Sequence, residues 1–223
     1  MKPSWDSAWE KVFQEREWGK YPPEELIRFV ARNFYKAPDR TSIKILDIGC
    51  GTGACTWYLA REGFSAYGID GSKTAIAIAI RRLEMEALKA EFVVGDLIQL
   101  PYPDGFFDGV IDVAAIECNK IANVKEIFAQ VYRALRPGGK FFSIAIKTGS
   151  YGYGEGDEIE RNTFTNVRVG PHKGQGIIHF FTEREIRHLL NLNQFKNIEI
   201  EWSARTLNNQ KNKIIHWIVT TQK

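Results

Sequence analysis

The stretch Leu46–Gly53 reads LDIGCGTG and runs from an apolar segment into a turn that holds three glycines within five residues. The residues from Ile43 to Ile48 are almost all apolar, as expected for a central strand of a parallel sheet that is covered on both faces. Ala54–Arg61 follows as a short helix, closed by Gly63. The stretch therefore predicts a strand, a tight glycine turn and a helix, which is the unit of an α/β fold.

The following segments continue this alternation of strands and helices. The AIAIAI run at residues 75–80 could be a strand by alternation alone, but its alanines and the following RRLEMEALK favour a helix capped by Ser72. Asn123 and Glu126 form a capping-box pattern at the start of another helix. The expected strands are residues 65–70, 91–94, 107–113 and 140–146. This order predicts a mainly parallel sheet.

The end of the chain predicts a different pairing of strands. Thr182 and Glu185 open a further helix as a capping box. Two alternating segments, Ile198–Ala204 and Ile214–Thr221, flank a polar tip and are typical of a hairpin. The sheet is therefore expected to end in an antiparallel pair.

A chain of 223 residues with 44% apolar side chains is expected to form one large domain with an appendage. We expect an N-terminal helical lid over residues 1–40 and a cofactor-binding domain over residues 41–223. Residues 148–178 are rich in glycine and show no helical period, so they predict a long loop near the substrate.

Charge and composition exclude several classes of function. The 30 basic and 27 acidic residues give a net charge of +3 without a block of either sign, so no nucleic-acid partner is expected. No apolar run is long enough to span a membrane. The three cysteines lack a C-x-x-C spacing, which indicates reduced thiols in a cytoplasmic protein and no metal site.

Two acids beside the glycine turn indicate which ligand it receives. Asp70 ends the second strand, 21 positions after Gly49, where an acid accepts hydrogen bonds from ribose hydroxyls. Asp47 lies two residues before Gly49, where it would repel a pyrophosphate and attract an ammonium group. S-adenosylmethionine fits both acids, because it is a positively charged nucleoside without phosphate. Since Gly49-x-Gly51-x-x-Ala54 also satisfies the relaxed dinucleotide fingerprint, an oxidoreductase remains an alternative.

LDIGCGTG resembles the first motif of the class I S-adenosylmethionine-dependent methyltransferases, and the resemblance extends over residues 43–147. YGIDGS resembles the end of the family's second strand, VVGDLIQLPYPDGFFDGVID its third and fourth strands, and ALRPGGKFFSIAI its next helix, turn and strand. The resemblance implies a Rossmann-like α/β fold. Its seven-stranded sheet would be mainly parallel with an antiparallel last strand and helices on both faces.

The resemblance also implies a cofactor site at the carboxyl edge of the sheet. Asp47 would lie near the ammonium group of S-adenosylmethionine, Asp70 at the ribose and Asp96 at the adenine amino group. The glycine backbone would lie against the methionine part. The cofactor-binding residues expected on this basis are Asp47, Gly49, Gly51, Gly53, Asp70, Gly71, Asp96, Leu97 and Ala114.

The acceptor side carries fewer signals. Methyl transfer from a sulfonium depends mainly on positioning and a dry site, so a general base is optional. His179, between the long loop and a capped helix, and Glu117, after the fourth strand, are the expected catalytic candidates. The expected substrate contacts are Trp18, Tyr21, Tyr151 and Arg161.

The sequence thus predicts an enzyme that transfers a methyl group from S-adenosylmethionine to a small polar acceptor, such as a sugar. It would act as a monomer or homodimer. Two alternatives stay open: an NAD(P)-dependent oxidoreductase, and a catalytically silent partner that binds the donor and supports another methyltransferase.

Overall fold

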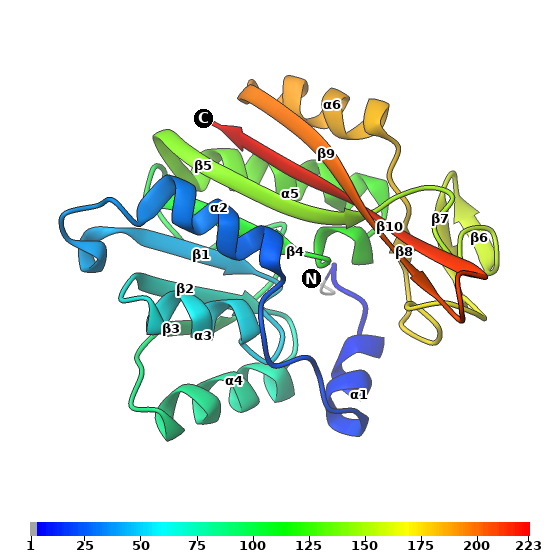
Figure 1. Cartoon of the computed structure of the whole chain (residues 1–223), viewed down its shortest axis with the longest axis horizontal. Helices are drawn as coiled ribbons and strands as arrows, with labels where there is room; N and C mark the ends of the chain where they lie inside the picture. The colour runs from blue at the N-terminus through cyan, green and yellow to red at the C-terminus, as the bar shows by residue number, and fades with distance from the viewer. Residues whose placement is uncertain (1–3) are drawn as a thin grey trace.

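The computed structural model describes residues 4–223, which form a seven-stranded sheet with helices on both faces (Figure 1). The strands of this sheet are β1 (Lys44–Ile48), β2 (Ser65–Asp70), β3 (Glu91–Val94), β4 (Phe107–Val113), β5 (Leu135–Ile146), β9 (Lys196–Leu207) and β10 (Asn212–Gln222). The helices are α1 (Ala8–Glu15), α2 (Glu24–Phe34), α3 (Ala54–Arg61), α4 (Lys73–Met85), α5 (Ile121–Ala134) and α6 (Glu183–Leu192), with short 3-10 turns η1 (Arg40–Ser42) and η2 (Ile116–Cys118).

The strand order is β3-β2-β1-β4-β5-β10-β9. Neighbouring strands from β3 to β5 are parallel, whereas β10 is antiparallel to both β5 and β9. The chain order reverses at β1, because β2 lies on one side of it and β4 on the other. A crevice at the carboxyl ends of the strands forms at such a reversal. The predicted fold class is confirmed.

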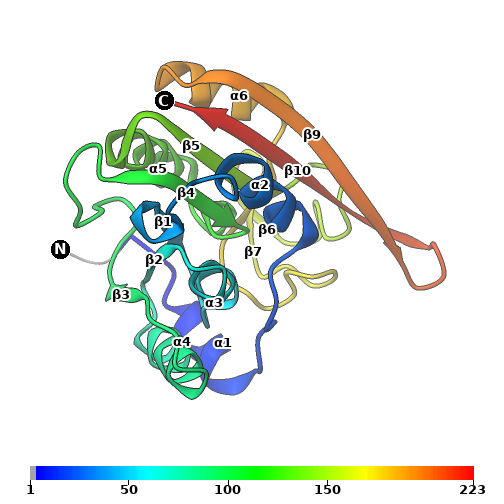
Figure 2. The ribbon, with the colours of Figure 1, turned by 60° about the vertical axis from the view of Figure 1, so that its left-hand side comes forward.

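The alternation of side chains along β1 explains how the sheet is covered. Ile45 packs on one face with residues of α2, α3 and α4. Leu46 and Ile48 pack on the opposite face with residues of α5 and α6. Figure 2 shows α2 and α5 on opposite sides of the sheet. A central strand that is apolar on both faces is the pattern seen in the sequence.

Several boundaries agree with the sequence to the residue, including those of α3, β2, β3 and β4. The AIAIAI run lies in α4, as predicted. The predicted capping box of α5 is wrong, since α5 begins at Ile121 with Lys120 as its N-cap. The Asn123 side chain instead donates a hydrogen bond of 3.2 Å to the carbonyl oxygen of Ser4. A contact 119 residues away in sequence thus replaces the local cap.

The glycine-rich segment 148–178 contains a second, three-stranded sheet of β6 (Asp157–Glu160), β7 (Thr163–Thr165) and β8 (Ile178–His179). Phe164 and Phe180 are buried there and pack with Ile146 and Ile214, which belong to the main sheet. The segment is therefore folded against the end of the β9–β10 hairpin (Figure 1). The strands β6 and β7 could not be predicted from the sequence, because alternation cannot be recognised over so few residues.

The N-terminal residues divide between the core and the crevice. Leu26 and Val30 of α2 are fully buried in the core between α2 and the sheet. Helix α1 lies beside α4, below the carboxyl edge (Figure 1).

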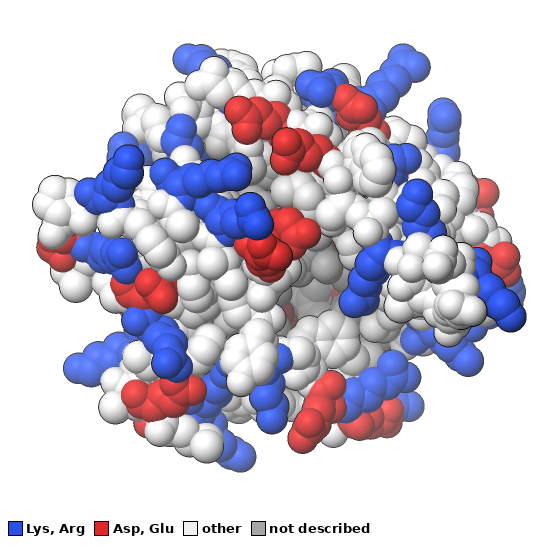
Figure 3. Space-filling model, in the orientation of Figure 1, with Lys and Arg blue, Asp and Glu red and all other residues white. Residues whose placement is uncertain are grey.

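Within residues 4–223, no helix is long and apolar enough to cross a membrane. On the face drawn in Figure 3, acidic and basic side chains are interspersed around a hollow near its centre.

Candidate functional site

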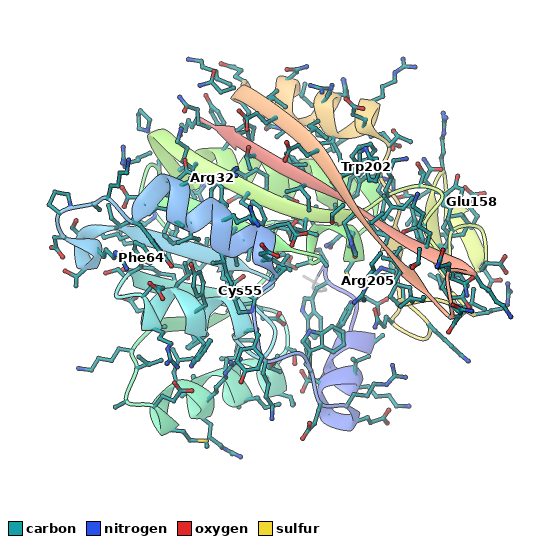
Figure 4. The ribbon with its side chains drawn as sticks, in the orientation of Figure 1. Arg32, Cys55, Phe64, Glu158, Trp202 and Arg205 are labelled. Atoms are coloured by element: carbon teal, nitrogen blue, oxygen red, sulfur yellow. The ribbon has the colours of Figure 1, made fainter. Side chains whose placement is uncertain are left out.

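A cavity opens at the carboxyl ends of β1 to β4, and the N-terminal segment forms its opposite side. All of the predicted cofactor-binding residues line this cavity except Gly53. Gly53 instead packs behind the turn, where an added Cβ would come 2.8 Å from the Cβ of Ala79. Figure 4 shows Cys55, another lining residue, on α3 near the end of β1. The strand ends therefore bring the predicted set together.

The turn after β1 requires glycine for two separate reasons. Gly49 has a φ of +64°, which disfavours side chains with a Cβ. In addition, a Cβ on Gly49 would come 2.2 Å from the Cβ of Ala115, so the turn and the segment after β4 touch. Bare backbone at this position lets the two segments meet at the floor of the cavity.

Asp47 lies beneath this turn and is only 2% exposed. Its Oδ2 accepts hydrogen bonds from the backbone N–H and the hydroxyl of Thr56, at 3.0 and 2.7 Å. Burial raises the pKa of Asp47 to about 7, although the bonds from Thr56 oppose the shift. A positive charge in the cavity would favour the ionised form, so the carboxyl group is suited to an ammonium ligand.

Asp70 holds the glycine turn and the start of α4 in place. Its Oδ2 accepts a hydrogen bond from the N–H of Gly51 at 2.9 Å, and its Oδ1 accepts one from Ser72 at 2.8 Å. Burial raises the pKa of Asp70, and both bonds oppose that shift. Each oxygen keeps a second lone pair. The carboxylate can therefore still accept bonds from two hydroxyl groups.

Asp112, which the sequence analysis missed, shapes the cavity floor from beneath. It is fully buried, its Oδ1 accepts from the N–H groups of Ala115 and Ile116, and its Oδ2 accepts from the hydroxyl of Ser143 at 2.6 Å. Burial raises the pKa of Asp112 to about 6. These bonds support Ala114, whose φ of +62° is strained for a residue with a Cβ. An acid at the apolar end of β4, between Ile111 and Val113, was the available signal.

The other half of the cavity is aromatic. Trp9, Phe13 and Trp18 pack against one another with ring centroids 5.6 to 5.8 Å apart, and Trp5 and Tyr21 also line the cavity. The buried Nε1 of Trp9 has no hydrogen-bond partner among residues 4–223. An unpaired buried donor is costly, so this N–H is available to a bound ligand. Trp18 and Tyr21 were expected at the substrate.

The structure does not bring four predicted residues to the cavity. Tyr151 and Arg161 lie in the segment 148–178 and are not among its lining residues. His179 is 1% exposed, its Nδ1 lies 2.7 Å from the hydroxyl of Thr163, and burial lowers its pKa. Glu117 is fully buried behind the residues that face the cavity. These four residues therefore lie outside the lining of the cavity.

Glu117 belongs instead to a buried pair below the cavity floor. Its Oε2 accepts a hydrogen bond from the N–H of Ile146, and its Oε1 lies 3.4 Å from the Nε2 of His172. Burial raises the pKa of Glu117 to about 8 and lowers that of His172 to about 4. Near neutral pH, a protonated carboxyl group therefore faces a neutral imidazole. The pair joins the turn after β4 to the segment 148–178.

The comparisons with known proteins agree with this site. Residues 45–139 match a family described as a methyltransferase domain. A sterol 24-C-methyltransferase of Gibberella zeae is 32% identical over 144 residues, which cover 62% of this chain and 35% of that protein. A demethylmenaquinone methyltransferase of Symbiobacterium thermophilum is 30% identical over 143 residues, which cover 61% of this chain and 53% of that protein.

The whole fold is also similar to a solved structure. The crystal structure of an S-adenosylmethionine-dependent methyltransferase from Methanosarcina mazei has a TM-score of 0.71 and 26% identity, and the match covers 91% of this chain and 98% of that one. The sheet order and the crevice define a Rossmann-like α/β fold. The family match over residues 45–139, the sheet order and the similar solved structure all agree with a class I S-adenosylmethionine-dependent methyltransferase.

Proposed function

We propose that the protein binds S-adenosylmethionine in the cavity at the carboxyl ends of β1 to β4 and transfers its methyl group to a small molecule. One observation carries the proposal: the acids near the end of β1 and at the end of β2, and the one that follows β3, line a single cavity with the glycine turn. When bound, S-adenosylmethionine supplies a methyl group on a sulfonium, which is a good leaving group.

The residues present fit this donor. Asp47 offers a buried carboxyl group to the ammonium, and Asp70 keeps lone pairs for the two ribose hydroxyls. Asp96 follows β3, and Leu97 offers an apolar side chain next to it. The backbone of Gly49 and Gly51 approaches the cavity without side chains. Together these groups would hold a positively charged nucleoside without phosphate.

The acceptor half suits an uncharged or positively charged molecule. The lining residues, all within the part of the chain that the structure describes, include four aspartates and no lysine, arginine or histidine. A phosphate on the acceptor would find no cationic side chain among these residues. The relatives above are named for a sterol and for demethylmenaquinone. A sugar remains a prediction, because aromatic rings can also pack on its apolar face.

The protein's own contribution would be orientation and the exclusion of water. The aromatic wall formed by Trp9, Phe13 and Trp18 can position an acceptor against the segment after β4, which includes Ala114. The unpaired Nε1–H of Trp9 can donate a hydrogen bond to an oxygen of the methyl acceptor. The proposal assigns no direct contact to His179 or Glu117.

The first test is calorimetric titration with S-adenosylhomocysteine, and separately with NAD and NADP. We expect binding of S-adenosylhomocysteine only, and Asp70→Ala should weaken it by about 1–3 kcal/mol, since bonds to a charged group are lost. Asp104→Ala is the matched control, because the Asp104 side chain is 80% exposed and outside the cavity. Binding of a dinucleotide alone would replace the proposal with the oxidoreductase alternative.

The second test uses a labelled methyl donor and matched acceptors. Hydroxyl compounds, amines and their phosphorylated counterparts are incubated with the protein under the same conditions. We expect transfer to uncharged compounds or amines and none to the phosphorylated forms. Donor binding without transfer to any acceptor would favour the catalytically silent partner. The three free cysteines fit the predicted cytoplasmic location, which fractionation of cells that express the protein would test.

A further inference from the structure

Trp5 lies against Gly71 at the carboxyl end of β2, inside the cavity. A Cβ built on Gly71 would come 2.4 Å from the Trp5 ring, and its three nearest neighbours would all be atoms of that ring. Gly71 is not among the glycines with positive φ, so its backbone would accept another residue. The position is bare because the indole of Trp5 occupies the space of its side chain.

Ser4, next to Trp5, binds the acid that follows β3. Its backbone N–H donates to Oδ2 of Asp96 at 2.6 Å, and its hydroxyl donates to Oδ1 at 2.5 Å. Oδ1 also accepts from the N–H of Ile98 at 3.2 Å. A carboxylate offers about four lone-pair sites. Oδ1 is therefore saturated, whereas Oδ2 keeps one site for a further donor.

Two acids hold this segment in place without a ligand. Asp6 accepts hydrogen bonds from the N–H groups of Ala8 and Ile177, at 2.9 and 3.0 Å. Glu10 accepts from the hydroxyls of Ser72 and Thr74 at the start of α4, both at 2.5 Å. These bonds tie the segment to α4 on one side and to the segment 148–178 on the other. These bonds fix the position of the Trp5 ring in the cavity.

We propose that Trp5 is the wall against which the adenine ring of the bound donor stacks, in place of a side chain at position 71. Ser4 acts with it as a positioning residue, because it turns Asp96 so that the last free site on Oδ2 faces the adenine amino group. The proposal rests on the proposed donor site and adds to it two residues from the far end of the chain.

The chemistry of the surroundings favours a flat base over other ligands at this point. An indole face and the apolar side chain of Leu97 line the same cavity, next to a carboxylate with one free acceptor site. An aromatic base offers a face for stacking and an N–H donor at its edge. Stacking of a base on an aromatic side chain contributes enough binding free energy to be measured by alanine substitution.

The test compares S-adenosylhomocysteine with 5′-methylthioadenosine, which has the same nucleoside but lacks the amino acid part. By calorimetry, Trp5→Ala should weaken both ligands by the same factor, about tenfold or more, and Trp5→Phe by less than about threefold. The matched control is Trp202→Ala, since Trp202 projects from β9, is 60% exposed and lies outside the cavity (Figure 4). The control should bind both ligands normally.

A second variant separates stacking from a purely structural role of the segment. Gly71→Leu in the Trp5→Ala background replaces the missing ring with a side chain from position 71 itself. If Trp5 acts as a wall, this double variant recovers at least part of the lost affinity for both ligands. If Trp5 only holds the segment closed, the added leucine recovers nothing.

The remaining outcomes are equally decisive. Unchanged affinity in Trp5→Ala overturns the proposal. Tighter binding overturns it as well, because it would show that the ring competes with adenine. A larger loss for S-adenosylhomocysteine than for 5′-methylthioadenosine would place Trp5 at the methionine part instead. Failure of the unmodified protein to bind either ligand would refute the donor site itself, which is a separate result.

Discussion

At the scale of single residues, the site depends on carboxyl groups that the fold removes from water. Asp47 and Asp112 lie on neighbouring parallel strands and are almost completely buried. Both are hydrogen-bonded by the chain, and burial raises the pKa of each. The two side chains have different surroundings. The carboxylate of Asp112 accepts hydrogen bonds from the turn that follows its own strand, whereas Asp47 lines the cavity. Of these two acids, only Asp47 can contact a ligand.

The raised pKa of Asp47 predicts that donor binding depends on pH. With a pKa of about 7, this carboxyl group is mostly protonated at pH 6 and mostly ionised at pH 8. The ammonium group of the ligand prefers the ionised form, so affinity should fall as pH falls through 7. We expect S-adenosylhomocysteine to bind about tenfold more weakly at pH 6 than at pH 8, measured by calorimetry.

The control for this pH effect is Asp47→Asn, which keeps the shape of the side chain and cannot ionise. At pH 8 it should bind more weakly than the unmodified protein, and its affinity should change little between pH 6 and pH 8. Equal slopes in the two proteins would assign the titration to another group, such as Asp70, whose pKa is also raised.

At the scale of elements, the sequence predicted most of the fold because local signals agreed with the tertiary structure. The glycine turn predicted the start of α3, and the acid Asp70 predicted the end of β2. The start of α5 could not be predicted, since Asn123 binds Ser4 from the far end of the chain. The place of Trp5 in the cavity could not be predicted for the same reason: its position beside Gly71 depends on contacts that span the chain.

The start of α6 shows the opposite case, in which a local signal was sufficient. Thr182 and Glu185 form the predicted capping box, with bonds in both directions. Loss of such a cap costs about 1 kcal/mol. For a chain of this size, Thr182→Ala should therefore lower the melting temperature by about 2–4 °C, as measured by circular dichroism.

The capping variant should not change the affinity for S-adenosylhomocysteine, because neither Thr182 nor α6 lines the cavity. Thr206→Ala, at an exposed position of β9, is the matched control and should melt like the unmodified protein. A drop in melting temperature equal to that of the control would show that the capping box contributes nothing to stability.

At the scale of the whole molecule, the N-terminal forty residues do not behave as one unit. α2 contributes four buried side chains to the core: Leu26, Phe29, Val30 and Phe34. Burial of each is worth about 1.5–3 kcal/mol, and their sum is comparable with the total stability of a domain, about 5–15 kcal/mol. By contrast, α1 and its flanks mainly border the cavity. We therefore propose that, among the described residues, the lid comprises residues 4–21.

Two truncations test this division. Removal of residues 1–21 should leave a protein that unfolds cooperatively, because both main core clusters stay intact. The same truncation should weaken S-adenosylhomocysteine by more than tenfold, since it removes Trp5, Trp9 and Phe13 from the cavity. Removal of residues 1–40 should abolish cooperative unfolding, because it exposes the apolar face beneath α2. Thermal unfolding and calorimetry on both proteins give the two readouts.

The pair of truncations distinguishes a lid from a structural helix. If the shorter truncation also fails to unfold cooperatively, α1 belongs to the core, and the contact of Phe13 with Gly51 supports the glycine turn even without a ligand. If it folds and binds S-adenosylhomocysteine with full affinity, the strand ends alone hold the donor and the aromatic wall serves only the acceptor. A folded protein with weakened donor binding is the result expected from bonds that already join Ser4 to Asp96 and Glu10 to Ser72.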